Sequence, residues 1–206
     1  MTSLARIFAA PALALGLAFA GAPAALADGH GAGIMTSVVE SQLPEKKVNV
    51  TGLYITAAEA MKVLDDRDDV ALVDVRSPAE TMLVGYATAT DVNIPFKTID
   101  PEHPYNAKKG RYGMRANPGF VDEVKAFVAR ENPAALLVMC RSGGRSAMAV
   151  NALAEAGVEV PAYTVVDGFE GDKSDAGKRT VNGWKNAGGA WTYKVRPGLW
   201  PAAGDS

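Results

Sequence analysis

The sequence contains a single cysteine, Cys140, among its 206 residues. No intramolecular disulfide can therefore form, and the stability of the fold has to come from a buried core. Two interpretations of this lone thiol are open at this point. Cys140 is either a small buried hydrophobe without chemistry or a thiol that is kept for its reactivity despite the risk of oxidation.

Histidine is almost as scarce, with His30 and His103 as its two occurrences. A catalytic Cys–His pair would have to use His103 and would require precise reach, so we expect Cys140 to act without a histidine base. His30 offers a different chemistry if the mature chain begins at Asp28. A free amine, two amides and an imidazole would then form a square-planar site for Cu(II) or Ni(II). The competing interpretation is a disordered tail with an incidental histidine, and we expect no other metal site.

No excess of basic residues is present, since 21 Lys and Arg stand against 23 Asp and Glu, for a net charge of -2. This balance argues against nucleic acid as a partner. The local basic cluster of Lys108, Lys109, Arg111 and Arg115 is interpreted as a solvated loop. The chain is 48% hydrophobic, which suits one globular domain with a sizeable core.

The first 27 residues carry one charge, Arg6, then an apolar run over residues 7–20 and a small-residue end at Ala27. This pattern predicts a secretory signal peptide that is cleaved after Ala27. The alternative is a membrane anchor, but prolines bracket the run and leave it short for a span. No Arg-Arg pair occurs, which favours the general secretion route. We therefore expect an exported protein, periplasmic or equivalent, with no membrane attachment after cleavage.

Short apolar runs alternate with helical patterns along the rest of the chain, which predicts an α/β domain with a mostly parallel sheet flanked by helices. Strands are expected at 70–75, 92–95, 134–139 and 162–166, and helices at 57–64, 118–128 and 146–156. Thr56 and Glu59 form a capping box for the first helix, and Asn117 is the expected N-cap of the second.

The domain is placed at residues 51–194, between an N-terminal tail at 28–50 and a C-terminal tail at 195–206. Residues 97–116 are rich in proline and glycine and are expected to form a loop insertion. Ser77-Pro78 is expected to turn the chain.

The segment from Cys140 to Ser146 lies between a buried strand and a helix N-terminus. Ligands of open α/β sheets bind at the carboxyl ends of strands, and a helix N-terminus offers unpaired N–H groups and positive potential. Glycines allow the tight turn that aims these groups inward. This environment favours thiolate over thiol. The expected substrate-binding residues are Arg141, Ser142, Gly143, Gly144, Arg145 and Ser146.

The two arginines of this loop suit an oxyanion because guanidinium groups bind oxyanions through bidentate hydrogen bonds. The alternative for each arginine is exposure to solvent. If the arginines do bind an anion, Cys140 lies where it could attack that anion as a nucleophile.

Four segments together resemble a known family. The loop fits the pattern C-x-x-G-x-R of rhodanese-like domains, the family of single-domain thiosulfate sulfurtransferases. The other matches, in the family's order, are Asp74-Val75-Arg76-Ser77-Pro78-Ala79-Glu80, Asn93-Ile94-Pro95, and Val166-Asp167-Gly168-Phe169 with Gly183-Trp184. The resemblance covers residues 56–191 and departs from the family at Gly85-Tyr86-Ala87, where Gly-His-Ile is usual.

This resemblance implies a sulfurtransferase without a cofactor. Cys140 would take sulfur from thiosulfate or a persulfide donor, hold it as a persulfide, and pass it to a thiol, cyanide or sulfite. Asp74, Arg76 and Glu80 are interpreted as structural residues that tie loops together. Segments 97–116 and 172–180 look longer than in minimal members of the family, so they shape the site or dock a protein partner.

Two other functions are weighed against this one. The first is a non-catalytic sulfur-relay or binding module. The second is a phosphatase or arsenate-reductase-like enzyme. Those enzymes use C-x-x-x-x-x-R, which is one residue longer, and a backbone ring has to match the size of its anion.

Overall fold

The computed structural model describes residues 32–201. The expected signal peptide and His30 lie outside the described residues, so both expectations stay predictions. Among the described helices, none combines the length and the apolar character needed to cross a lipid bilayer.

The core of the molecule is a five-stranded sheet in which every pairing is parallel. In spatial order its strands are β1 (Tyr54–Ile55), β10 (Ala162–Val165), β9 (Ala135–Met139), β2 (Val70–Asp74) and β4 (Val92–Asn93). Strands β2 and β9 are buried along their whole length, as expected for a parallel sheet that is covered on both faces. The predicted α/β fold class is confirmed.

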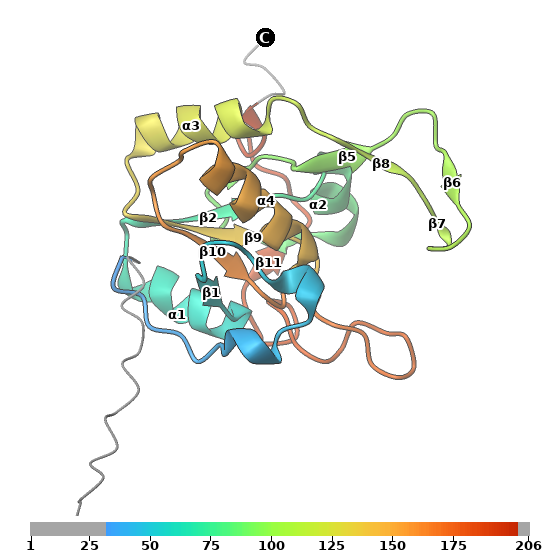
Figure 1. The fold of residues 1–206 in the computed structure, drawn as a ribbon, viewed down its shortest axis with the longest axis horizontal. Helices are drawn as coiled ribbons and strands as arrows, with labels where there is room; N and C mark the ends of the chain where they lie inside the picture. Colours follow the sequence, from blue (N-terminus) through green and yellow to red (C-terminus); the bar gives the residue numbers. More distant parts are fainter. Residues whose placement is uncertain (1–31, 202–206) are drawn as a thin grey trace, which may run out of the picture.

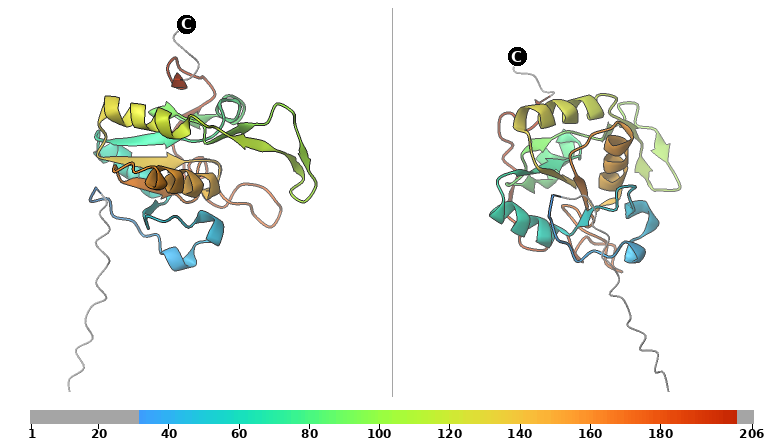
Figure 2. Two further views of the ribbon diagram at one scale, coloured as in Figure 1. Left: turned by 45° about the horizontal axis from the view of Figure 1, so that its top comes forward. Right: turned by 60° about the vertical axis from the view of Figure 1, so that its left-hand side comes forward.

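Helices cover both faces of this sheet (Figures 1 and 2). Helices α3 (Phe120–Glu131) and α4 (Gly144–Glu155) pack on one face, together with Leu136 and Val138 of β9. Helix α1 (Ala57–Asp66) packs on the other face with Leu137 and Met139. Alternate residues of β9 thus enter two separate cores, because successive side chains of a strand point to opposite faces.

Two of the helices begin with a capping box. Thr56 and Glu59 form the predicted box of α1. Ser77 and Glu80 form a second box, with proline at the first helical position, and start α2 (Pro78–Val84). The expected turn at Ser77-Pro78 is therefore wrong, because these residues are the cap and first position of a helix.

The starts of α3 and α4 also differ from the prediction. The N-cap of α3 is Gly119 and not Asn117. The Asn117 side chain instead accepts a hydrogen bond from Gly119 N at 3.0 Å, in a turn that precedes the helix. Helix α4 begins at Gly144, two residues earlier than expected. The loop that starts at Cys140, which we call the cysteine loop, therefore leads directly into the helix.

Residues 97–116 form a β-hairpin, which we call the arm, and not the expected loop. Strand β5 (Lys97–Ile99) pairs with β8 (Met114–Ala116), and β6 (Tyr105–Asn106) pairs with β7 (Arg111–Tyr112). The arm projects away from the sheet and its helices (Figures 1 and 2). Its prolines and glycines lie in the corners between these short strands and not in a structureless insertion.

Segments outside residues 51–194 also contact the domain. The N-terminal segment contains η1 (Glu40–Gln42) and η2 (Glu45–Lys47), and the buried Lys47 forms an ion pair with Asp172 at 2.7 Å. Near the other terminus, Leu199 is buried and its carbonyl accepts a hydrogen bond from Asn93 N at 2.6 Å. A small antiparallel pair, β11 (Trp191–Thr192) with β3 (Tyr86–Ala87), closes the domain.

Candidate active site at the cysteine loop

Cys140 lies directly after β9, the middle strand of the sheet, and four residues before the first residue of α4. Its residue is 1% exposed, yet it lines a cleft with a volume of about 660 Å³. The cleft is therefore at the carboxyl end of the parallel strands, where the fold class places ligand sites.

The carbonyl groups at the start of the cysteine loop accept backbone hydrogen bonds, whereas the N–H groups of the loop after Cys140 have no hydrogen-bond partner among residues 32–201. Phe169 N donates to Cys140 O at 2.8 Å, and Glu170 N donates to Arg141 O at 3.0 Å. Within the described part of the chain, no backbone N–H of residues 141–146 donates a hydrogen bond. These N–H groups next to Cys140 are available to an anion.

Two glycines make the close packing of this loop possible. Gly143 has φ +92°, and a Cβ there would lie 2.1 Å from Val166 O. Gly168 has φ +63°, and a Cβ there would lie 2.5 Å from Cys140 O. Any side chain at either position would push apart the cysteine loop and the segment after β10, so only glycine fits.

Both arginines of the loop line the cleft, but each is paired with a carboxylate. Arg145 makes a bidentate contact with Glu80, with N–O distances of 2.7 and 2.6 Å. Burial acts to raise the pKa of Glu80, but the hydrogen bonds and charge of Arg145 outweigh it and lower that pKa to about 2. Arg141 forms an ion pair with Glu170. An incoming anion can therefore bind only the guanidinium N–H groups that do not already donate to Glu80 or Glu170.

The structure brings four of the six predicted substrate-binding residues to the cleft: Arg141, Ser142, Gly144 and Arg145. The other two point elsewhere. Gly143 faces Val166, and Ser146 is fully buried inside the first turn of α4. Neither of these residues lines the cleft.

The three residues interpreted as structural separate into two groups. Asp74 and Arg76 form an ion pair at 2.6 Å with both side chains 0% exposed. Arg76 also donates to Gly85 O at 3.0 Å, and its guanidinium lies 4.1 Å from the centroid of the Phe169 ring. Glu80 differs, because it lines the cleft and holds Arg145.

Several cleft residues were missed by the sequence analysis. The arm contributes Arg111, Tyr112 and Met114, the segment after β10 contributes Arg179, and η2 contributes Lys46. Burial and the charge of Arg141 lower the pKa of Arg179. The extra length of segments 97–116 and 172–180 was the one signal for the arm residues and Arg179, since no motif contains them. Lys46 lies in the expected N-terminal tail, and no sequence signal pointed to it. His103 is in the arm and does not line the cleft.

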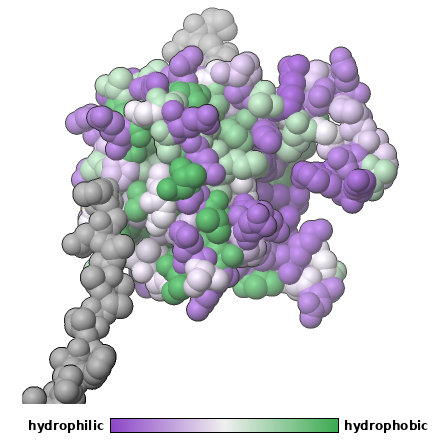
Figure 3. All heavy atoms as spheres, in the orientation of Figure 1, coloured by the Kyte–Doolittle hydropathy of each residue, from purple (hydrophilic) through white to green (hydrophobic). Residues whose placement is uncertain are grey.

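Positive charge dominates the lining of the cleft. Its cations are Lys46, Arg111, Arg141, Arg145 and Arg179, and its one carboxylate is Glu80. In Figure 3 the surface is recessed between the arm and the segment below it, with hydrophilic residues on both sides. The site therefore favours an anionic ligand.

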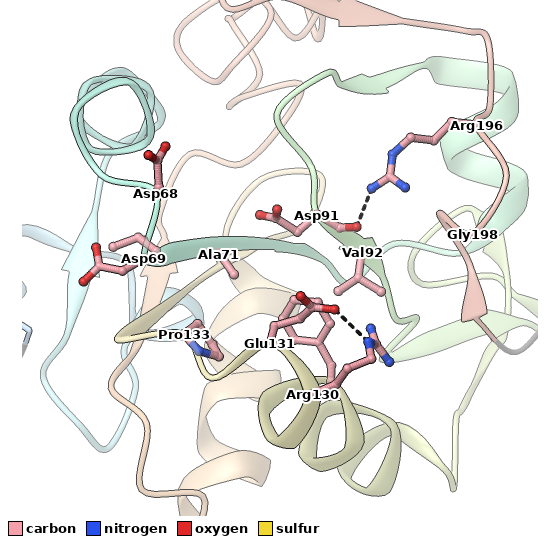
Figure 4. Close-up of a pocket in the computed structure, with 12 residues that line it drawn as sticks. Asp68, Asp69, Ala71, Asp91, Val92, Arg130, Glu131, Pro133, Arg196 and Gly198 are labelled. Carbon is pink, nitrogen blue, oxygen red and sulfur yellow. Dashed lines mark hydrogen bonds and ion pairs between the residues drawn. The ribbon is translucent and has the colours of Figure 1, made fainter.

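A second pocket, with a volume of about 340 Å³, lies at the amino end of the parallel strands, where β2 begins (Figure 4). Carboxylates outnumber cations in its lining, which contains Asp68, Asp69, Asp91 and Glu131 beside Arg130 and Arg196. Burial raises the pKa of Asp91. It holds no cysteine. Within residues 32–201, no group of three or more His, Cys, Asp or Glu side chains is arranged to hold a metal ion.

Comparison with known proteins finds no family model that matches this chain. The chain is 30% identical over 140 residues to the uncharacterized protein RC0915 of Rickettsia conorii, covering 68% of this chain and 96% of that protein. It is 32% identical to Rv0390 of M. tuberculosis, whose crystal structure matches with a TM-score of 0.53 over 68% of this chain and 96% of that one. A thiosulfate sulfurtransferase from Pseudomonas aeruginosa matches with 17% identity and a TM-score of 0.46, over 70% of this chain and 21% of that one.

Proposed function

The chain belongs to the same family as RC0915 and Rv0390, and from the site it carries we propose that it is a sulfurtransferase that moves a sulfane sulfur through a persulfide on Cys140. Neither relative's name states an activity, so the proposal rests on the site. The observation that carries it is the placement of Cys140 beside unpaired backbone N–H groups in a cationic cleft.

The first half of the reaction loads the sulfur. The Cys140 thiolate attacks the outer sulfur of thiosulfate, the S–S bond of thiosulfate breaks, and sulfite leaves with the bonding electrons. The product is an anionic persulfide, so the number of negative charges is unchanged. Unpaired N–H groups of the loop residues that line the cleft, such as Ser142 and Gly144, and the cations of the cleft would stabilise the anion before and after the transfer.

The second half returns the enzyme to its starting state. An acceptor thiolate or cyanide attacks the outer sulfur of the persulfide, and the Cys140 sulfur leaves as thiolate. No oxidant, reductant or cofactor is consumed in either half. A persulfide donor can replace thiosulfate in the first half by the same displacement.

The length of the loop supports sulfur over phosphate as cargo. Cys140 and Arg145 enclose four residues, one fewer than in the phosphatase pattern, and the ring of donors has to fit its anion. The site also carries an intact nucleophile, which a module that only binds persulfides would not need. Export of the protein is part of the proposal and rests on the pattern of residues 1–27.

The test is to incubate the purified chain with thiosulfate and to measure intact mass and sulfite together. We expect a gain of about 32 Da, equal to one sulfur, with one sulfite released per chain, and no gain in Cys140→Ser. Cyanide should then remove the added mass as thiocyanate. If wild-type protein gains no sulfur from thiosulfate, polysulfide or a small persulfide, the proposal is wrong. Turnover of p-nitrophenyl phosphate would instead support the phosphatase.

A further inference from the structure

We propose that the arm docks an acidic protein whose surface thiol exchanges sulfur with Cys140. This inference rests on the proposed function and deepens it, because it names the class of partner. It follows from the size of the cleft, its apolar rim and the distribution of charge on the arm.

The cleft is much larger than thiosulfate requires. Its volume of about 660 Å³ is in the range of roughly 300–1,000 Å³ that accommodates drug-sized ligands. Without the arm the site would be open on one side, since Ile99 and residues 111–114 all belong to the arm and line the cleft. The arm thus enlarges the site well beyond a binding site for a small inorganic anion.

The rim of the cleft is apolar as well as cationic. Ile99 and Tyr112 of the arm are 47% and 61% exposed, and Met148 of α4 is 41% exposed. All three line the cleft. Exposed apolar side chains grouped around a site mark a surface that binds another protein, and a small anion would gain nothing from them.

Charge on the arm extends past the cleft. The arm has a net charge of +3, although the net charge of the whole chain is -2. Its cations are Lys97, Lys108, Lys109, Arg111 and Arg115, and its carboxylates are Asp100 and Glu102. Lys108 and Lys109 are exposed and do not line the cleft. A ligand that fits inside the cleft cannot use them, whereas an acidic macromolecule can.

The position of the sulfur favours a protein over a nucleic acid as that macromolecule. Cys140 is 1% exposed, so its partner has to bring a thiol into the cleft on a protruding segment. The partner thiolate attacks the outer sulfur of the Cys140 persulfide, the S–S bond breaks, and Cys140 leaves as thiolate. The same exchange in reverse loads Cys140 from a persulfidated partner.

Two synthetic peptides of equal length test the proposal. Each contains one cysteine and one leucine, flanked by aspartates in one peptide and by asparagines in the other. Sulfur is loaded on the full chain with thiosulfate, and kcat/KM for transfer to each peptide is measured by mass spectrometry. We expect a preference for the acidic peptide of roughly ten-fold at low ionic strength, falling at high salt because salt screens exposed charges.

A pair of double variants locates the effect. Lys108→Glu with Lys109→Glu should abolish the preference for the acidic peptide. The matched control is Lys62→Glu with Lys125→Glu, which makes the same change of charge at exposed sites on α1 and α3 and should keep the preference. Circular dichroism of each variant confirms that it is folded.

Three results would overturn the docking proposal. The first is equal kcat/KM for the two peptides, and the second is a preference that survives in the arm variant or is lost equally in the control. The third is tight binding of a single-stranded oligonucleotide that blocks transfer to the acidic peptide. The proposed function fails separately, because in that case neither thiosulfate, polysulfide nor a small persulfide would load sulfur on wild-type protein.

Discussion

The two ends of the central sheet differ in charge and in chemistry more than in the presence of a cavity. The carboxyl end has the cationic cleft with Cys140 at its base, and the amino end has an acidic pocket without a nucleophile (Figure 4). The same parallel strands form both ends. The difference lies in the strand-to-helix loops, whose unpaired N–H groups and arginines give the carboxyl end its affinity for anions. No strand-to-helix loop of the described chain lines the cavity at the amino end.

Ion pairs at the two ends should differ most in their contribution to stability. Arg76→Met leaves Asp74 fully buried without its partner, and we expect a loss of about 3–5 kcal/mol in the free energy of unfolding. Arg130→Met at the amino end breaks a pair whose side chains are 59% and 50% exposed, and should cost less than about 1 kcal/mol. Urea denaturation measures both. Equal losses would contradict this comparison.

Glu80 should make the carboxyl end sensitive to acid. Its pKa is lowered from 4.5 to about 2 in the folded state. Its contribution is therefore present above pH 4.5 and is lost as pH falls towards 2. We expect Glu80→Gln to lower stability by on the order of 2–3 kcal/mol at pH 7 and by little near pH 2.

Denaturation midpoints between pH 7 and pH 2 measure this difference. Glu131→Gln, in the exposed pair at the amino end, is the control and should follow wild-type protein at every pH. A Glu80→Gln curve that stays parallel to wild type down to pH 2 would show that Arg145 does not hold this carboxylate as we describe.

Arg179 should contribute to binding at the carboxyl end. It lines the Cys140 cleft, and a charge-assisted hydrogen bond to thiosulfate contributes about 1.5–3 kcal/mol. We expect Arg179→Gln to raise KM for thiosulfate roughly ten-fold. Because Arg179 also donates a hydrogen bond to Gly171 O, the substitution should lower stability by about 0.5–1.5 kcal/mol. Arg196→Gln at the amino end should leave KM unchanged. A rise in KM of equal size in both variants would remove the distinction between the two ends.

Sequence patterns predicted the core elements because their signals are local. Residues 134–139 are apolar throughout and residues 70–75 are apolar except for Asp74, and a run of that kind has few alternatives to a buried parallel strand. The capping box of Thr56 and Glu59 was predicted correctly because it also is a local signal. Ser77 and Glu80 form a box of the same kind, but Ser77-Pro78 fits a turn as well as a helix start, so the local signal is ambiguous there.

The outer half of the site could not be predicted because it depends on contacts between distant segments. Glu80 and Arg145 are 65 residues apart in the chain, and only the tertiary fold joins them. The same applies to Arg179 and to the arm, whose strands are two or three residues long and carry too little periodicity to distinguish a hairpin from a loop.

Strand order also determines when the thiol becomes shielded during folding. β9 pairs with β2 on one side and β10 on the other, and β1 pairs with β10 across more than half of the domain sequence. Sheets built from such distant segments form slowly, because the entropy of closing long loops is lost before the contacts form. Cys140 is thus accessible to solvent until β9 has both neighbours, so a bulky thiol reagent added during refolding would report the moment at which the sheet closes.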